Sequence, residues 1–192
     1  MARVGVLALQ GDFAEHLQVL KDLDVEGVEV RLPQDLERVD ALIIPGGEST
    51  TMCRLMDLYH LGEPLKARVH AGMPVWGTCA GMIILARELT EDRPKPLGLV
   101  NIVVTRNAFG RQIDSFEEDL HIPALGDEPF RAVFIRAPSI REVGEGVEVM
   151  ASLPDGTPVA ARQGRILVTA FHPELTNDTR FHAYFLQWLN KG

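Results

Sequence analysis

Short runs of apolar, partly β-branched residues alternate with helical patterns along the first half of the chain. Residues 4–9 form such a run that ends at Gln10-Gly11, which predicts a buried strand. Residues 13–23 follow with apolar side chains at i, i+4 and i+7, the spacing of an amphipathic helix. By the same criteria we predict further strands over residues 28–32, 41–44 and 74–76. Further helices are predicted over residues 50–59, 64–71 and 80–89.

This alternation of strands and helices predicts an α/β fold. Its doubly wound, mostly parallel sheet has flanking helices on both faces, as in flavodoxin-like proteins. The second half of the chain instead reads as strands with few helical patterns between them, namely 99–105, 130–135, 147–153, 159–162 and 166–169. We expect some of these strands to form an antiparallel extension at one edge of the sheet. A last helix over 178–190 has an apolar face that packs on the sheet. Without internal repeats or a low-complexity linker, residues 1–192 are expected to form a single domain.

Composition narrows the function classes. The 192 residues include 19 basic and 27 acidic side chains, a formal net charge of −8, which argues against nucleic acid as a partner. Two cysteines are too few for a disulfide scaffold or a zinc site of four cysteine ligands. No apolar run approaches the roughly 18 residues of a membrane span, and the first residues do not resemble a signal peptide. We therefore expect a cytoplasmic protein with no membrane partner.

The strongest local signal is a Gly-x-Cys-x-Gly turn at Gly77, Cys79 and Gly81, between a predicted strand and a very apolar helix. This is the nucleophile-elbow arrangement with cysteine in place of serine. Side chains at either glycine would collide with the neighbouring strand and helix. The turn holds the sulfur at a helix N-terminus, where the helix dipole and free N–H groups favour a thiolate. The alternative is a buried structural cysteine.

A thiolate nucleophile needs a proton donor, and His172 is the best placed histidine. It follows the predicted strand 166–169, so it faces the crevice at the carboxyl ends of the strands, where Cys79 is also expected. Glu174, held close by an intervening proline, is positioned to bond the far imidazole nitrogen. His16 and His182 fall within predicted helices, where we expect a solvated or capping role. The alternative for His172 is an ordinary loop histidine.

A third feature is the segment 43–51, in which a buried strand runs into Pro-Gly-Gly and then into a helix capped by Ser49 or Thr50. Successive N–H groups in a Gly-Gly turn form a concave site for an anion. Such a site suits an oxyanion beside Cys79 or a substrate carboxylate. A plain strand-to-helix connection is the alternative.

Together these features resemble the class I, or triad, glutamine amidotransferases. The chain is most similar to the family of glutaminase subunits of two-protein pyridoxal 5′-phosphate synthases. The matching blocks run through nearly the whole chain in the family's order: residues 8–11, 46–51, 76–81, 106–112 with 114–117, 134–138 and 171–175. The block 106–117 is the most discriminating, because other triad glutaminases lack it.

The resemblance implies that Cys79 is the nucleophile, His172 the acid-base group and Glu174 its orienting partner. The oxyanion would be held by N–H groups of Gly47 and Ala80. The residues implied to contact bound glutamine are Gly47, Glu48, Ser49, Arg106, Ile135 and Arg136. Three further residues of the discriminating block receive no role: Arg111, Asp114 and Glu117. Cys53 is expected to be a buried helix residue.

The resemblance also implies a partner. L-Glutamine would be the substrate, and ammonia would pass to a synthase subunit in a hetero-oligomeric complex, with Gln10 a candidate contact to that subunit. No cofactor or metal is expected, since pyridoxal phosphate would be the partner's product. The alternatives are a glutaminase for another biosynthetic synthase, a stand-alone cysteine amidase or peptidase, and a non-enzymatic regulatory module. Arg106 and Arg136 argue against the stand-alone hydrolase, and the intact Cys79, His172 and Glu174 argue against the regulatory module.

Overall fold

A seven-stranded sheet forms the centre of the molecule. The computed structural model describes residues 2–110 and 114–190. Its main sheet has the order β10-β11-β12-β4-β3-β1-β2, in which neighbours from β12 to β2 are parallel and the β10-β11-β12 edge is antiparallel. The strands are β1 (Arg3–Leu7), β2 (Glu26–Val30), β3 (Ala41–Ile44), β4 (Val75–Thr78), β10 (Glu148–Ser152), β11 (Pro158–Gln163) and β12 (Ile166–Thr169). The predicted doubly wound fold with an antiparallel extension is therefore confirmed.

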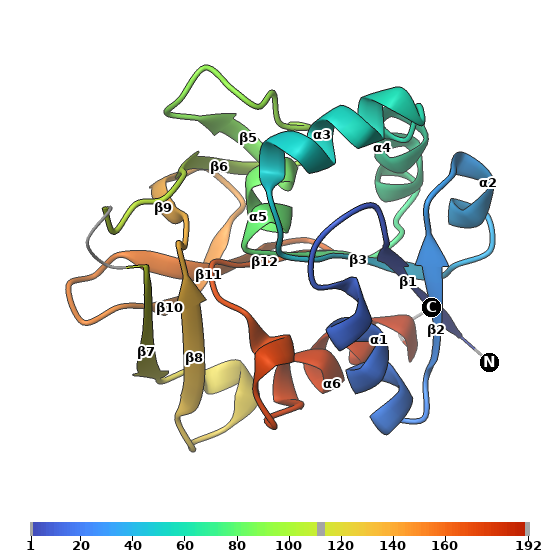
Figure 1. The fold of residues 1–192 in the computed structure, drawn as a ribbon. Helices are drawn as coiled ribbons and strands as arrows, with labels where there is room; N and C mark the ends of the chain where they lie inside the picture. The colour runs from blue at the N-terminus through green and yellow to red at the C-terminus, as the bar shows by residue number, and fades with distance from the viewer. Residues whose placement is uncertain (1, 111–113, 191–192) are drawn as a thin grey trace.

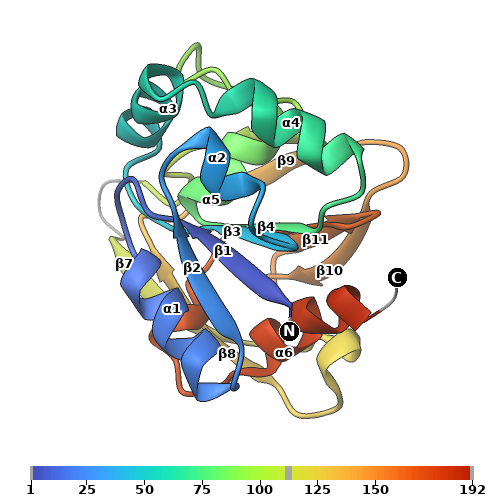
Figure 2. The same ribbon diagram turned by 90° about the vertical axis from the view of Figure 1, so that its right-hand side faces the viewer.

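Helices cover both faces of this sheet (Figures 1 and 2). One face carries α3 (Ser49–Leu58), α4 (Gly62–His70) and α5 (Ala80–Leu85). The other carries α1 (Phe13–Asp22) and α6 (Arg180–Leu186), and the short α2 (Pro33–Leu36) follows β2. Among the described residues, no helix combines the length and apolar character needed to cross a membrane.

Two small sheets flank the antiparallel side of the main sheet (Figure 1). One contains β5 (Ala86–Leu89), β6 (Val100–Thr105) and β9 (Ser139–Val143), and the other pairs β7 (Ser115–Leu120) with β8 (Phe130–Ile135). Phe116 and Phe134 stack across β7 and β8 with ring centroids 4.5 Å apart, and Phe134 also meets Phe171 at 5.4 Å, which packs this hairpin against the core.

The predicted helix over 80–89 is wrong beyond Leu85. The chain leaves the helix at Ala86 and continues as β5, which pairs in parallel with β6 through Ala86–Val100 and Leu89–Val104. The four residues Ala-Arg-Glu-Leu are too few to show a helical or a strand period, and pairing with a segment 14 or 15 positions later decided between the two. The sequence reading also missed α2, β7 and β9.

The parallel strands bring several chain segments to one edge of the main sheet. Thr78 at the end of β4 is in register with Thr169 at the end of β12, and Ile44 of β3 is in register with Gly77. β1 lies beside both β2 and β3, so the strand order reverses at β1 and β3. In doubly wound folds, ligands bind in the crevice at such a point, beyond the carboxyl ends of the strands.

Candidate active site

Cys79 lies in a strained turn between β4 and α5. Its φ of 49° and ψ of −103° are unusual for a residue with a Cβ, and its N–H donates to the Thr169 carbonyl at 2.8 Å. The two flanking glycines are required by close packing, as predicted: a Cβ on Gly77 would lie 2.4 Å from the Gly81 backbone, and one on Gly81 would lie 2.1 Å from the Ile44 carbonyl. The turn therefore fixes the buried thiol at the crevice.

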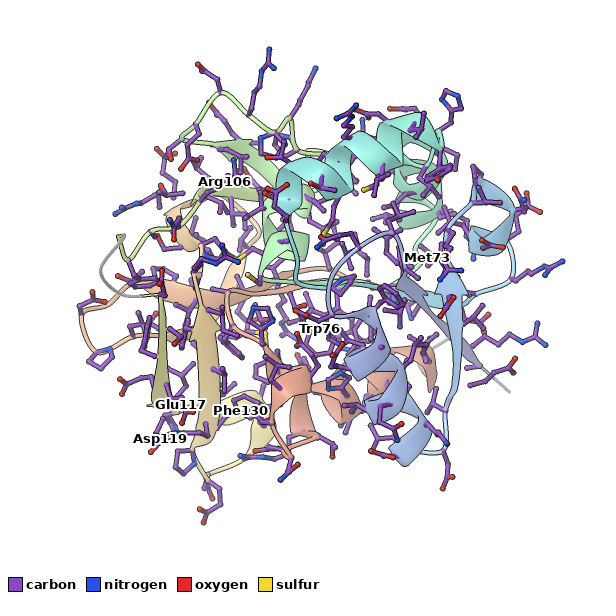
Figure 3. The ribbon with its side chains drawn as sticks, in the orientation of Figure 1. Met73, Trp76, Arg106, Glu117, Asp119 and Phe130 are labelled. Carbon is purple, nitrogen blue, oxygen red and sulfur yellow. The ribbon has the colours of Figure 1, made fainter. Side chains whose placement is uncertain are left out.

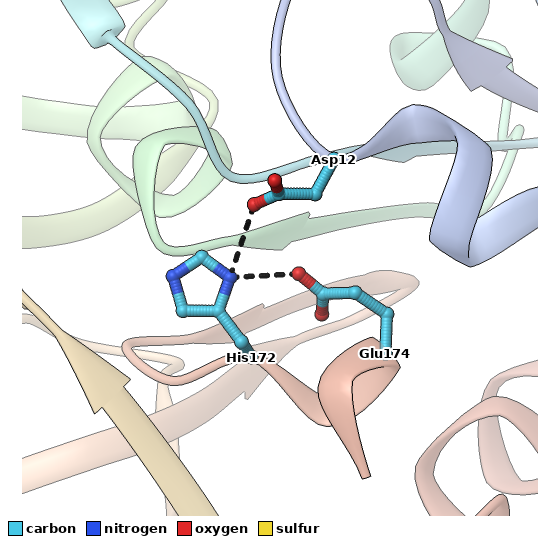
Figure 4. A group of neighbouring side chains, drawn as sticks. All are labelled: Asp12, His172 and Glu174. Carbon is cyan, nitrogen blue, oxygen red and sulfur yellow. Dashed lines mark hydrogen bonds and ion pairs between the residues drawn. The ribbon is translucent and has the colours of Figure 1, made fainter. Parts of the chain in front are cut away.

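His172 follows β12 and sits between two carboxylates (Figure 4). Its Nδ1 lies 2.7 Å from Glu174 Oε1 and 3.3 Å from Asp12 Oδ2. Glu174 lies in the short 3-10 helix Pro173–Leu175, and its side chain is fully buried. The predicted contact between Glu174 and the far imidazole nitrogen is present, and Asp12 adds a second acceptor.

The surroundings of His172 favour its protonated form. Burial acts to lower the pKa of His172, but hydrogen bonds with Asp12, Cys79 and Glu174 outweigh it and raise the pKa to about 12. Burial raises the pKa of Glu174, and the hydrogen bond from His172 acts against this rise. An imidazolium beside the thiol stabilises a thiolate, so the arrangement suits nucleophilic attack followed by proton donation.

Asp12, His172 and Glu174 also have ligand types that metals accept, with their ligand atoms within 4.8 Å of one another. Both carboxylates, however, meet the same nitrogen, Nδ1, and the 2.7 Å separation from Glu174 is that of a charge-assisted hydrogen bond. A nitrogen that carries a proton is not a metal ligand. The cluster is therefore better suited to acid-base chemistry than to holding a metal.

The Gly46-Gly47 turn after β3 is fastened to the segment after β1. The Asp12 N–H donates to the Gly46 carbonyl at 3.0 Å, and the Glu48 N–H donates to Gln10 Oε1 at 2.8 Å. A Cβ on Gly46 would lie 2.3 Å from His172 Cε1, so only glycine allows the imidazole to pack against this turn.

The prediction that Ser49 or Thr50 caps the following helix is wrong. Glu48 is the N-cap of α3, and its carboxylate accepts hydrogen bonds from the N–H groups of Thr50 and Thr51 at 3.0 and 2.7 Å. A longer side chain takes the capping role here because Glu48 already has extended backbone angles that aim it at the first turn. Hydrogen bonds from Thr51 and Thr50 outweigh the effect of burial and lower the pKa of Glu48, which keeps it charged.

These segments enclose a cavity of about 620 Å³ at the carboxyl edge of the sheet. At one side, Arg106 Nη2 lies 3.4 Å from Glu48 Oε1, and the Arg106 N–H and Nη1 donate to Glu91 Oε1 and the Arg93 carbonyl, each at 3.0 Å. The cavity is lined by Gln10, Gly11, Asp12, Gly47, Glu48, Ser49, Cys79, Ile83, Glu91, Arg106, Asn107, Ile135, Arg136, His172 and Leu175.

The structure brings most of the predicted site residues together. Eight of them line the cavity: Cys79, His172, Gly47, Glu48, Ser49, Arg106, Ile135 and Arg136. Glu174 lies behind His172, and Ala80 begins α5 directly after Cys79. Sequence reasoning missed Asp12, Glu91, Asn107 and Leu175, although the position of Asp12 just after a strand was a usable signal.

The three residues without a predicted role have different positions. Arg111 lies outside the described residues. The Asp114 carbonyl accepts a hydrogen bond from the Arg136 N–H at 2.6 Å, next to the cavity. Glu117 pairs with Arg131 across β7 and β8 at 2.8 Å, and Figure 3 shows it far from Arg106. Cys53 lies on α3 as predicted, but it is only half-buried.

The expectation that His16 and His182 are solvated or capping residues is wrong, because both are fully buried. His16 Nδ1 lies 2.9 Å from His182 Nε2, and Trp76, at the centre of the molecule in Figure 3, meets both rings edge-on. α1 and α6 pack side by side on one face of the sheet. Each buried histidine therefore serves as a hydrogen-bond partner for the other. Burial lowers the pKa of His182 to about 3 and that of His16 well below its usual value.

This burial predicts a loss of stability in mild acid. Unfolded His182 takes up a proton below its ordinary pKa of 6.5, whereas the folded side chain stays neutral down to about pH 3. The unfolded state therefore binds more protons, and the free energy of unfolding falls as the pH drops from 6.5 towards 3, with about 2 kcal/mol lost at about pH 5. Urea unfolding at about pH 7.5 and pH 5 measures this loss.

Glu174 and His172, whose pKa values are raised, act with the opposite sign above their ordinary pKa values, so the comparison is between parent and variant. His182→Leu is expected to flatten the pH dependence, and His60→Asn, at an exposed site with a positive φ that asparagine tolerates, is expected to keep it. An unchanged slope in His182→Leu would contradict the assignment of a neutral buried histidine.

Comparison with known proteins identifies the family. The model of the SNO glutamine amidotransferase family matches residues 6–191. A protein of Herpetosiphon aurantiacus called pyridoxal 5′-phosphate synthase subunit PdxT is 60% identical over 186 residues, 95% of this chain and 98% of the relative. One of the same name from Pelotomaculum thermopropionicum is 59% identical over 96% of this chain and 94% of the relative.

Solved structures agree with this result. A crystal structure described as a glutamine amidotransferase has a TM-score of 0.92 and 51% identity, covering 97% of this chain and 98% of the other. PurLQS of Thermotoga maritima, with a TM-score of 0.75 and 14% identity, shares the fold. The chain belongs to the SNO glutamine amidotransferase family.

Proposed function

We propose that this protein is a glutaminase that hydrolyses L-glutamine to L-glutamate and ammonia through a Cys79 thioester. The observation that carries the proposal is the shared cavity, which is lined by a strained cysteine, by an imidazole whose Nδ1 contacts two carboxylates and by an arginine-glutamate pair. Cysteine and imidazole supply the nucleophile and the proton donor of acyl transfer.

The reaction follows from these positions. The Cys79 thiolate attacks the side-chain amide carbon of glutamine, and N–H groups of Gly47 and Ala80 hold the resulting oxyanion. The imidazolium of His172, oriented by Glu174, gives its proton to the departing nitrogen, because an amide does not release its nitrogen as an anion. Water then attacks the thioester as His172 takes its proton, and collapse of the intermediate releases glutamate and restores the Cys79 thiolate and the His172 imidazolium.

We assign recognition of the α-carboxylate and α-ammonium groups of glutamine to Arg106 and Glu48, which also line the cavity. Arg106 and Glu48 present opposite charges 3.4 Å apart, which complements the α-carboxylate and α-ammonium of one amino acid. Glu48 is held by its capping bonds and Arg106 by Glu91 and the Arg93 carbonyl, so both are fixed in place. We assign further contacts to glutamine to Gly47, Ser49, Ile135 and Arg136.

Arg106→Ala is expected to raise the KM for glutamine by about 10- to 100-fold, the value of one charge-assisted hydrogen bond, with a smaller change in kcat. Steady-state ammonia release across a glutamine series measures both constants. Arg131→Ala is the matched control, since it removes an exposed arginine of β8 that pairs with Glu117 and Asp119 of β7. A KM equal to the parent's in Arg106→Ala would remove this residue from the binding site.

The ammonia is proposed to pass to a synthase subunit that makes pyridoxal 5′-phosphate. The relatives reported above carry the name of a subunit of that synthase, and free ammonia is useful only if it reaches its acceptor unprotonated. Gln10 is the proposed contact through which the partner acts, because it holds the Glu48 N–H next to the Gly46-Gly47 turn. Both cysteines are free thiols, as is usual in the reducing cytosol, and we propose that the protein is cytoplasmic.

The test is glutamine hydrolysis measured with and without the synthase subunit from the same organism. The proposal expects ammonia release that rises strongly when the synthase is present and that requires the α-amino acid head of the substrate. Hydrolysis of simple amides at the same rate, independent of the synthase, would instead favour the stand-alone cysteine amidase. No hydrolysis in either condition would favour the non-enzymatic module.

A further inference from the structure

The carboxylate of Glu174 has a second oxygen that the triad does not use. Oε1 faces His172, while Oε2 is completely buried and forms no hydrogen bond of good geometry with any residue described. A buried carboxylate oxygen without a donor is costly, so a polar N–H close to it stabilises the charged form. His16 of α1 places its Nε2 3.4 Å from this oxygen, and both side chains are fully shielded from solvent.

The nitrogen that carries the proton in His16 follows from the hydrogen bonds of His182, which contacts it. His182 Nδ1 is buried and, within residues 2–110 and 114–190, has no hydrogen-bond partner. A buried N–H without an acceptor is rarer than an acceptor without a donor, so the His182 proton belongs on Nε2. That N–H donates to His16 Nδ1 at 2.9 Å, and His16 must then carry its own proton on Nε2.

The His16 Nε2–H faces two acceptors. It makes a hydrogen bond at 3.3 Å with the hydroxyl oxygen of Thr78, the residue directly before the nucleophile. It also lies 3.4 Å from Glu174 Oε2, an electrostatic contact without the alignment of a hydrogen bond. The imidazole plane is held by Trp76, whose ring meets His16 at a centroid distance of 5.8 Å and His182 at 4.8 Å. Packing and the hydrogen bond to Thr78 thus keep this N–H beside Glu174 Oε2.

We propose that His16 is a positioning residue for the glutaminase reaction: its Nε2–H, hydrogen-bonded to Thr78, attracts the second oxygen of Glu174 at 3.4 Å and keeps the carboxylate charged and turned towards His172. The inference rests on the proposed function of Cys79, His172 and Glu174. His182 acts through His16 by fixing which nitrogen carries the proton.

The proposal predicts the sign of a pH effect. Without the donor at Oε2, ionised Glu174 is less stable, the imidazolium of His172 loses part of its support, and the Cys79 thiolate forms at higher pH. The titratable groups that face this set are Asp12 and His16 from the α1 segment, Cys79 from the turn before α5 and His182 from α6. The charged residues Glu48, Glu91, Arg106 and Arg136 also line the cavity and stay unchanged in every variant below.

The experiment compares His16→Leu with His16→Gln in the full chain. The rate of Cys79 alkylation by iodoacetamide is followed against pH by peptide mass spectrometry, which separates it from Cys53. His16→Leu is expected to move the midpoint of this profile up by about 0.5 to 1 unit, equivalent to part of one charge-assisted hydrogen bond. In the complex with the synthase subunit, its kcat for glutamine is expected to fall about tenfold with KM little changed.

His16→Gln is the conservative variant, because its amide N–H₂ can replace the Nε2–H donor. It is expected to restore the parent's midpoint and most of kcat. Equal losses in both variants without a shift of the midpoint would show a purely structural role and overturn the proposal. A parent-like midpoint and kcat in His16→Leu would overturn it as well.

His182→Leu keeps the test available if His16→Leu does not fold. Without the His182 donor, His16 is free to move its proton to Nδ1, so the midpoint is expected to shift upward by a smaller amount. If His16→Leu does not fold, a parent-like midpoint in folded His182→Leu would overturn the proposal. His172→Gln distinguishes failure of the proposed function from failure of the His16 proposal. If His172→Gln leaves the alkylation profile of Cys79 unchanged, the proposed function fails. If the midpoint shifts in His172→Gln but not in the His16 and His182 variants, only the role of His16 is refuted.

Discussion

Replacing Cys79 with alanine is expected to abolish glutamine-dependent ammonia release, with a loss of about 10⁴-fold or more, while glutamine affinity stays within a few-fold of the parent's. Among the described residues that line the cavity, Cys79 is the only one with a thiol to form the thioester, whereas binding of the α-carboxylate and α-ammonium is assigned to Arg106 and Glu48. Ammonia release in the reconstituted complex and calorimetric titration with glutamine measure the two effects.

Cys53→Ala is the matched control for this experiment. Cys53 is the second thiol of the chain, and burial, with a contribution from Asp57, raises its pKa to about 11, so it stays protonated at neutral pH. Cys53→Ala is therefore expected to keep the parent's rate. If Cys79→Ala also kept it, the assignment of the nucleophile would have to be abandoned.

The elements of the main sheet could be predicted because their apolar runs are bounded by strong turn signals. The strand predicted over 166–169 coincides with β12, and the Gly-x-Cys-x-Gly turn marked the end of β4. The segment after Leu85 could not be assigned in this way. Its residues have no period that separates a helix from a strand, and the choice was made by β6, which pairs with it. Tertiary pairing of this kind also accounts for β7 and β9, which the sequence reading missed.

The same distinction holds for the site. Cys79 and His172 could be predicted because each follows a strand whose carboxyl end faces the crevice. The burial of His16 and His182 could not, since the two side chains satisfy each other from helices 166 positions apart. A histidine in a helix is read as solvated when its polar partner is not visible in the local sequence. The capping role of Glu48 was missed for a related reason, because short hydroxyl residues directly beside it are the commoner caps.

Glu174→Gln is expected to lower kcat for glutamine by about 10² to 10⁴-fold with little change in KM, by analogy with carboxylate-to-amide changes in other triads. The amide has the shape of the carboxylate, so the 2.7 Å contact with His172 Nδ1 can remain, but the charge that stabilises the imidazolium is lost. Asp12 still faces Nδ1 at 3.3 Å, which is why a residual rate is expected rather than complete loss. Glu63→Gln, which removes the charge of an exposed glutamate that pairs with Lys66, is the matched control and is expected to behave like the parent. Parent-like kcat in Glu174→Gln would show that His172 needs no buried carboxylate behind it, and Asp12 would then be the partner that orients the imidazole.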